Sequence, residues 1–271
     1  MVKKKKLGFI GAGNMAEAMI KGLRASKVLK NYEITLSDVN VERLKTVAKK
    51  YSVKTSKDNS GLIKNSDIVI LAIKPQQIAE VLEAEKNNFS ATHLCISILA
   101  GVTIQKIQQL IGKKIPVVRV MPNIPVLVLE GACGYCVSKE VTAGMRKTTT
   151  EILGTFCKVA ENLPENEINI VTALSGSGPA YFFYFAEGML EAAQELGIDL
   201  KLAKKLIAQT MIGTGKMLSE KAETPAELRT KVTSKGGTTE SAINTMEEGA
   251  VKDVVRMAVK RAKEKADALG K

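Results

Sequence analysis

The sequence lacks several residue types on which common catalytic and metal-binding chemistries depend. It contains no tryptophan, and His93 is the only histidine among 271 residues. A lone histidine without a cluster of partners excludes Ser-His-Asp and Cys-His catalytic arrangements. Because His93 precedes the apolar run 94–99, we interpret it as a loop residue.

The four cysteines do not form a metal-binding pattern. Cys133 and Cys136 have the spacing of a zinc or redox pair, but no second pair at matching spacing is present. Residues 131–137 have the composition of a strand, in which positions three apart point to opposite faces. We therefore interpret both cysteines as structural and predict no metal site.

Long hydrophobic runs are also absent, and none is long enough to span a bilayer. Residues 1–23 briefly imitate a signal peptide, but Asn14 and Glu17 interrupt the apolar stretch and no clean small-residue cleavage site follows. We predict a cytoplasmic protein with no membrane partner.

Positive charge exceeds negative charge, with a formal net charge of +12. The lysines are spread along predicted helices, and no basic stripe is interleaved with aromatic residues. This distribution favours a solvated lysine-rich surface over nucleic-acid binding. A positive field would also attract small anionic ligands.

The first half of the chain alternates between two patterns. Short apolar runs typical of strands alternate with stretches of helical spacing, which predicts a parallel sheet covered on both faces. The predicted strands are residues 7–10, 33–37, 68–73, 94–99, 116–120 and 131–137, and the predicted helices are residues 14–25, 41–50, 75–85 and 103–111.

Helical periodicity dominates from about residue 163 to the end. Residues 251–269 have one apolar face, whereas residues 179–196 are apolar nearly all round. A helical domain of about a hundred residues has limited core for such a helix, so we expect a second subunit to pack on it. The alternative is a central helix buried within its own monomer. The predicted fold is α/β, with an N-terminal Rossmann-type parallel sheet domain (1–162) followed by an all-α dimerisation domain (163–271).

A glycine fingerprint follows the first predicted strand. In residues 9–16 (FIGAGNMA), Gly11 permits a tight turn, Gly13 lets the backbone approach a pyrophosphate, and Ala16 allows close helix–strand packing. Asn14 and Met15 open the helix, whose free N–H groups and dipole favour phosphate. The competing interpretation is a glycine turn without a ligand.

The second predicted strand ends at Ser37 and Asp38, where an acid that binds the adenosine ribose is expected. A carboxylate there can accept both ribose hydroxyls and repels a 2′-phosphate, and Val39 stands where an arginine would favour the phosphate. The cofactor is thus NAD(P)H with a mild preference for NADH. Lys45 and Lys49 on the next predicted helix could reach a 2′-phosphate, so NADPH remains an alternative cofactor.

These motifs together resemble the pyrroline-5-carboxylate reductase family over nearly the whole chain. The resemblance rests on residues 9–16, 72–75 (AIKP), 120–125 (VMPNIP), 173–181 (ALSGSGPAY) and 232–239 (VTSKGGTT). It implies reduction of 1-pyrroline-5-carboxylate to L-proline with NAD(P)H, the last step of proline biosynthesis. It also implies a Rossmann domain, an intertwined helical homodimer and, in many members, a decamer built from dimers.

The segment with Ala72, Lys74 and Pro75 follows a predicted strand, and we expect it to close over the cofactor, with ordinary turn chemistry as the competing interpretation of Lys74 and Pro75. We expect Asn123, which lies between two prolines, to have its side chain fixed on the cofactor side. The resemblance implies the remaining site residues. Ser177 borders the nicotinamide and substrate. The segment that holds the substrate carboxylate consists of Val232, Ser234, Gly236, Gly237 and Thr238. Thr239 places a hydroxyl near the ring nitrogen as donor or relay, and for Thr238, Thr239 and Ser177 helix capping is the competing role.

Three features depart from the family pattern. Lys235 stands where the family usually has proline, Asp38 and Val39 replace a polar–arginine pair, and Cys133 and Cys136 belong to no family motif. Two alternatives remain: a β-hydroxyacid dehydrogenase, whose catalytic lysine pattern we do not find, and a non-catalytic NAD(H)-binding redox sensor.

Overall fold

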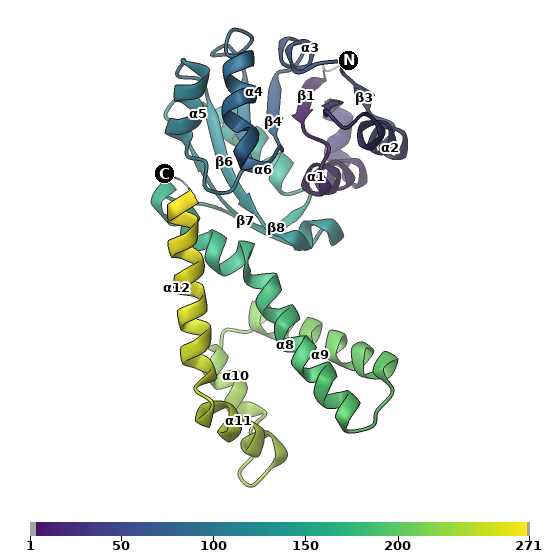
Figure 1. Ribbon diagram of the computed structural model, residues 1–271, viewed down its shortest axis with the longest axis vertical. Helices are drawn as coiled ribbons and strands as arrows, with labels where there is room; N and C mark the ends of the chain where they lie inside the picture. The colour runs from purple at the N-terminus through teal and green to yellow at the C-terminus, as the bar shows by residue number, and fades with distance from the viewer. Residues whose placement is uncertain (1–3, 270–271) are drawn as a thin grey trace. The chain divides into compact units, whose positions relative to one another are not determined.

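The computed structural model describes residues 4–269, which divide into two compact units (Figure 1). Unit 1 contains the chain up to residue 179 together with the end of the chain from residue 262. Unit 2 contains residues 180–261. The change from strands to helices does not coincide with the limits of these units, because the last strand ends at Asn162. The predicted domain boundary between residues 162 and 163 stays a prediction.

Unit 1 is built on one eight-stranded sheet in the order β3-β2-β1-β4-β5-β6-β7-β8. Six strands are parallel, whereas β7 runs antiparallel to β6 and β8 runs parallel to β7. The short segment between β6 and β7 cannot make the crossover that a parallel pair needs. The strands are β1 (Lys5–Ile10), β2 (Tyr32–Ser37), β3 (Lys54–Thr55), β4 (Ile68–Leu71), β5 (Leu94–Ser97), β6 (Val117–Pro122), β7 (Gly131–Val137) and β8 (Cys157–Asn162).

Helices cover both faces of this sheet and create two apolar cores (Figure 1). On one face pack α1 (Asn14–Ala25), α2 (Val41–Tyr51) and α6 (Ala143–Leu153). On the other pack α3 (Asn59–Lys64), α4 (Ile78–Glu85) and α5 (Ile104–Ile111). Short 3₁₀ turns fill the connections: η1 (Lys27–Asn31), η2 (Pro75–Gln77), η3 (Ile124–Val128) and η4 (Glu165–Glu167).

The predicted alternation is confirmed, with two corrections. Residues 68–73 and 94–99 were expected to be strands throughout, but β4 ends at Leu71 and β5 at Ser97. The apolar residues beyond these ends lie in the connecting segments at the carboxyl edge of the sheet. The sequence analysis also missed β3, α3, α6 and β8.

The cysteines lie in the cores of unit 1. Cys133 belongs to the core on one face of β7 and Cys136 to the core on the other. Burial raises the pKa of Cys136 to about 12. A hydrogen bond with Cys157, together with burial, raises the pKa of Cys133. Thiols held protonated in this way are poor ligands and nucleophiles, which supports their structural interpretation.

A nearly continuous helical path leads from unit 1 into unit 2. It begins with α7 (Ile168–Val171), passes through one π-helical turn, η5 (Thr172–Gly176), and continues as α8 (Gly178–Glu195). The Ser177 N–H donates to the Thr172 carbonyl over 2.8 Å, five residues back. Inserted π turns of this kind occur often at functional sites.

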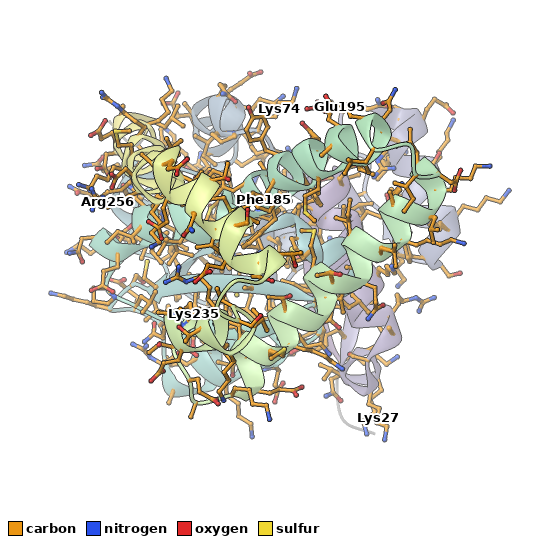
Figure 2. The ribbon with its side chains drawn as sticks, turned by 90° about the horizontal axis from the view of Figure 1, so that it is seen from below. Lys27, Lys74, Phe185, Glu195, Lys235 and Arg256 are labelled. Carbon is orange, nitrogen blue, oxygen red and sulfur yellow. The ribbon has the colours of Figure 1, made fainter. Side chains whose placement is uncertain are left out.

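Unit 2 is entirely helical and has almost no core of its own. It comprises most of α8, then α9 (Leu200–Glu220), α10 (Pro225–Lys231), α11 (Thr238–Glu248) and the first part of α12 (Val251–Leu269). Within residues 180–261, the buried apolar side chains are Ala203 and Ile207. Phe182 and Tyr184 on α8 are 64% and 78% exposed, and Phe185 lies on the same helix (Figure 2).

None of the described helices is both long and apolar enough to cross a membrane.

Candidate dinucleotide and substrate sites

The glycine fingerprint lies at the carboxyl edge of the sheet, directly after β1. Gly11 has a φ of +104°, and its N–H donates to the Ser37 carbonyl over 2.8 Å. A Cβ at this position would lie 2.5 Å from the carbonyl oxygen of Ala72, after β4. Gly11 is therefore required both by its backbone conformation and by the close approach of the two loops.

Gly13 and the start of α1 form an open candidate site for an anion. Among the described residues, leaving out Gly13 and its two chain neighbours, no heavy atom lies within 4 Å of the place a Gly13 Cβ would occupy, and Gly13 and Asn14 are exposed. The first helical hydrogen bond runs from Glu17 N to Gly13 O. The preceding N–H groups, including those of Asn14 and Met15, thus have no partner within the helix. These residues fit a dinucleotide pyrophosphate at a helix N-terminus.

Asp38 follows β2 as predicted and turns towards the glycine loop. Its Oδ2 accepts the Ala12 N–H over 2.6 Å, and its Oδ1 accepts the Asn40 N–H over 2.7 Å. Val39 is 90% exposed. Ser37 is buried, and its hydroxyl donates to Asn59 Oδ1 over 2.7 Å.

Arg43 lies beside the candidate cofactor site, and the sequence patterns did not predict it. The Arg43 Nε donates to the Ala12 carbonyl over 2.8 Å, while its guanidinium also contacts Asn14 and forms an ion pair with Glu17. Lys45, which the sequence analysis considered instead, pairs with Glu42 over 3.0 Å. The available signal was the capping residue Asn40, because it places Arg43 in the first turn of α2, beside the loop.

The segment 72–75 follows β4 at the same edge of the sheet. The Ala72 N–H donates to the Ile10 carbonyl over 2.9 Å, which holds this loop beside the fingerprint. Lys74 is exposed and precedes η2, with Pro75 at its first position. This arrangement matches the proline-initiated turn that the sequence predicts.

Two sequence motifs meet after β6. The Asn123 amide donates to the Ser175 hydroxyl over 3.1 Å and accepts the Ala132 N–H over 2.9 Å. A Cβ on Gly176 would lie 2.6 Å from Met121 Cε, so the π turn packs closely on β6. Ser177 has helical backbone angles and continues this helical path, so it does not have the extended backbone of a helix N-cap.

In unit 2 the segment 232–239 forms a tight loop between α10 and α11, and Figure 2 marks Lys235 in it. The Gly236 N–H donates to the Glu240 carboxylate over 2.7 Å, and the Gly237 N–H donates to the Ser234 carbonyl over 3.0 Å. The N–H groups of both glycines, which the resemblance places in the carboxylate-binding segment, are therefore engaged within the protein, one by Glu240 of α11 and one by Ser234. The N–H groups of Thr238, Thr239 and Glu240 instead precede the first helical bond, from Ser241 N to Gly237 O.

The N-cap of α11 is Gly237, so neither threonine caps the helix. Within the described part of the chain, no side-chain hydrogen bond of Thr238 or Thr239 is formed, and Val232 and Ser234 are exposed. The two hydroxyls are thus available to a ligand.

Two further hollows lie away from these segments. Cavities of about 470 and 390 Å³ are lined by the amino-terminal ends of the strands, among them residues 32–34 and residues 67 and 68. Ligands of open α/β sheets bind at the carboxyl ends instead. Among the described residues, no group of three or more His, Cys, Asp and Glu side chains is placed to hold a metal ion.

Comparisons with known proteins agree with this arrangement. Residues 165–269 match the model of the pyrroline-5-carboxylate reductase dimerisation domain. Residues 6–101 match the model described as NADP oxidoreductase, coenzyme F420-dependent.

Full-length relatives have the same architecture. A pyrroline-5-carboxylate reductase of Methanosarcina acetivorans is 39% identical over the whole of both chains. Pyrroline-5-carboxylate reductase 2 of Bacillus subtilis is 38% identical over 93% of this chain and 90% of its own. The solved reductase from Coxiella burnetii has a TM-score of 0.90 at 35% identity, covering 99% and 100% of the two chains. A Plasmodium falciparum reductase solved with NADP bound has a TM-score of 0.88 at 30% identity, covering all of both chains.

Proposed function

Because the chain belongs to the pyrroline-5-carboxylate reductase family, we propose that it reduces 1-pyrroline-5-carboxylate to L-proline with NAD(P)H, the last step of proline biosynthesis. The observation that carries the proposal is the full-length similarity to reductases of this name. Neither a β-hydroxyacid dehydrogenase nor a non-catalytic redox sensor accounts for that similarity.

Unit 1 supplies the cofactor site in this proposal. The open start of α1, with Gly11, Gly13, Asn14 and Met15, holds the pyrophosphate, and Ser37 and Asp38 border the adenosine ribose. When bound, the nicotinamide supplies the hydride. Ala72, Lys74, Pro75 and Asn123 shape the same edge of the sheet. Here the protein orients the cofactor and excludes water rather than reacting covalently.

The loop 232–239 holds the substrate carboxylate. Its donors are the unpaired N–H groups at the start of α11 and the Thr238 hydroxyl, while Val232, Ser234, Gly236 and Gly237 shape the loop. Thr239 donates a hydrogen bond to the ring nitrogen or relays a proton to it, which makes the imine carbon a better electrophile. Ser177 borders the reacting groups from the end of the π turn.

NADH is the cofactor that these residues favour. The Asp38 carboxylate borders the ribose position, and exposed Val39 offers no charge to a 2′-phosphate. The bound NADP of the Plasmodium falciparum relative favours the alternative. We propose a mild preference for NADH over NADPH.

Because residues 165–269 match a dimerisation domain, we infer that the protein is a homodimer. Assembly of dimers into a decamer and a cytoplasmic location remain predictions from the sequence.

The proposed activity is tested by mixing the purified protein with pyrroline-5-carboxylate and either NADH or NADPH, and following nicotinamide absorbance. We expect oxidation of the cofactor with equimolar formation of proline. Turnover of a 3-hydroxy acid with NAD⁺ instead would support the β-hydroxyacid dehydrogenase alternative. Cofactor binding without turnover of either substrate would support the redox sensor.

A further inference from the structure

The two peptide groups that flank Ala12, at the centre of the glycine loop, are each held by a side chain that follows β2. The N–H of the buried residue Ala12, in the peptide from Gly11, donates to Asp38, and the Ala12 carbonyl, in the peptide to Gly13, accepts a hydrogen bond from Arg43 Nε. Gly11 and Gly13 have the freedom to let these two peptides rotate. The conformation of the loop therefore depends on two charged side chains outside it.

Arg43 is itself fixed by a charged cluster. Its guanidinium pairs with Glu17 on the first turns of α1, and Glu17 also accepts hydrogen bonds from Lys50 Nζ over 2.8 Å and from the Tyr51 hydroxyl over 3.0 Å. The hydrogen bond from Lys50 is the largest influence that holds the pKa of Glu17 below its usual range, with Arg43 and Tyr51 acting the same way and burial opposing them. Glu17 is consequently ionised at neutral pH and keeps Arg43 in place.

The direction of the Ala12 carbonyl decides what the loop offers to an anion. A carbonyl oxygen bonded to a guanidinium cannot turn towards the phosphates, where its partial negative charge would repel them. With the carbonyl held back, the N–H groups after Gly13 remain the groups that face the pyrophosphate. A loop already in its binding conformation loses less conformational entropy when the ligand arrives.

We propose that Arg43 is a positioning residue for the cofactor, which acts through the Ala12 carbonyl to hold the glycine loop ready for the pyrophosphate. This inference rests on the proposed use of a nicotinamide dinucleotide. It assigns Arg43 no contact with the adenosine 2′ position, so its contribution is the same for NADH and NADPH.

The test is calorimetric titration of the full chain with NADH and with NADPH in the absence of substrate. Because no turnover is measured, failure of the proposed reaction does not affect the result. We expect Arg43→Ala to weaken binding of both cofactors by a similar factor, roughly tenfold, as for loss of one charge-assisted hydrogen bond. Arg43→Lys should be intermediate, because an ammonium can reach either Ala12 or Glu17 but does not reproduce the planar fork.

A matched control is Lys54→Ala, which removes the ion pair of unit 1 between Lys54 and Glu33 at 2.9 Å. Both residues line the hollow at the amino-terminal end of β2, whereas the glycine loop follows the carboxyl end of β1. The substitution should leave both dissociation constants within about twofold, as for an exposed pair. In steady-state assays Arg43→Ala should raise KM for the cofactor and leave kcat at saturating cofactor unchanged. A purely structural residue would lower the unfolding temperature without this split.

Three outcomes would overturn the proposal. Unchanged affinity for both cofactors in Arg43→Ala would show that the loop holds its shape unaided. Loss of NADPH affinity alone would make Arg43 a direct ligand of the 2′-phosphate. If Arg43→Ala does not fold, Glu17→Gln and Arg43→Lys carry the test, and unchanged affinities in both would reject the proposal.

Discussion

At the scale of single residues, the most specific chemical prediction is that the Thr239 hydroxyl acts on the ring nitrogen of the substrate. Its hydroxyl follows a glycine-capped helix start and caps nothing itself. We expect Thr239→Val to lower kcat by about 10²-fold, the usual size of a lost proton donor, with a smaller change in KM. Thr239→Ser should keep most of the activity because it keeps the hydroxyl.

Thr150→Val is the matched control, since Thr150 is an exposed threonine of unit 1 whose hydroxyl bonds only to the Lys147 carbonyl. If Thr239→Val keeps the full kcat, the hydroxyl does not act on the ring nitrogen, and a bound water must supply the proton.

Asp38 and Val39 carry the prediction on cofactor choice. We expect Asp38→Ser with Val39→Arg to shift kcat/KM towards NADPH by roughly tenfold or more, because a guanidinium then replaces a carboxylate beside the 2′ position. Since Asp38 also accepts the Ala12 N–H, NADH efficiency should fall as well. Measured kcat/KM values for both cofactors check this. An unmodified protein that already prefers NADPH would contradict the account of Asp38.

The site residues that the sequence predicted lie in short local motifs, whereas most of those it did not predict depend on contacts between distant parts of the chain. Gly11, Gly13 and Asp38 lie in a motif whose spacing fixes their positions after β1 and β2. Arg43 was missed because its contacts, to Ala12 and Glu17, join residues more than twenty positions apart. The engagement of Gly236 by Glu240 was missed because it depends on how one loop folds back on α11.

At the scale of elements, hydrophobic periodicity predicted the long helices and the strands whose side chains are all apolar. The apolar runs gave the bounds of β2 to within one residue and those of β1 and β6 to within two, and helical spacing gave both bounds of α1. Helix α6 was missed because it contains a polar run, residues 148–150, and β8 because most of its side chains are at least partly exposed. The π turn was missed because its register depends on packing against β6 rather than on local propensity.

Gly176 tests the importance of that π turn. A Cβ there would lie 2.6 Å from Met121 Cε, the far end of a flexible side chain that must shift to make room. We expect Gly176→Ala to destabilise the protein by about 1 kcal/mol, at the low end of overpacking costs. It should also reduce activity, because Ser175 and Ser177 would shift. Thermal unfolding and kcat/KM measure the two effects.

Gly144→Ala is the control, because Gly144 lies in the first turn of α6 with a nearest neighbour at 4.0 Å. It should be neutral or slightly stabilising, since alanine has the higher helix propensity. Equal effects of the two substitutions would mean that the close approach at β6 has no special role.

At the scale of the whole molecule, unit 2 depends on a second copy of the chain. With Ala203 and Ile207 as the buried apolar residues of 180–261, and with large apolar side chains exposed along α8, a single chain leaves an extensive apolar surface in water. The aromatic run in residues 181–185 was the sequence signal for this contact. The sequence contains no comparable signal for a decamer, because association of dimers depends on the surface of the assembled dimer.

We expect Phe182→Glu to weaken the dimer and to lower activity in parallel, because a carboxylate would be buried without a partner. Val159→Glu, at an exposed apolar position on β8 of unit 1, should remain dimeric. Sedimentation velocity over a range of protein concentrations measures both. A fully active monomer in either variant, or in the unmodified protein, would contradict the dependence on a second copy.

Reduction of a cyclic imine is tested most directly by following the transferred hydrogen itself. The unmodified protein is incubated with pyrroline-5-carboxylate and NADH deuterated at both C4 positions of the nicotinamide, and in parallel with NADPH labelled in the same way, and the product is examined by NMR. Hydride transfer to the imine carbon predicts proline with one deuterium at C5 for each cofactor oxidised. Oxidation of the cofactor without deuterated proline, or no oxidation with either cofactor, would contradict the account.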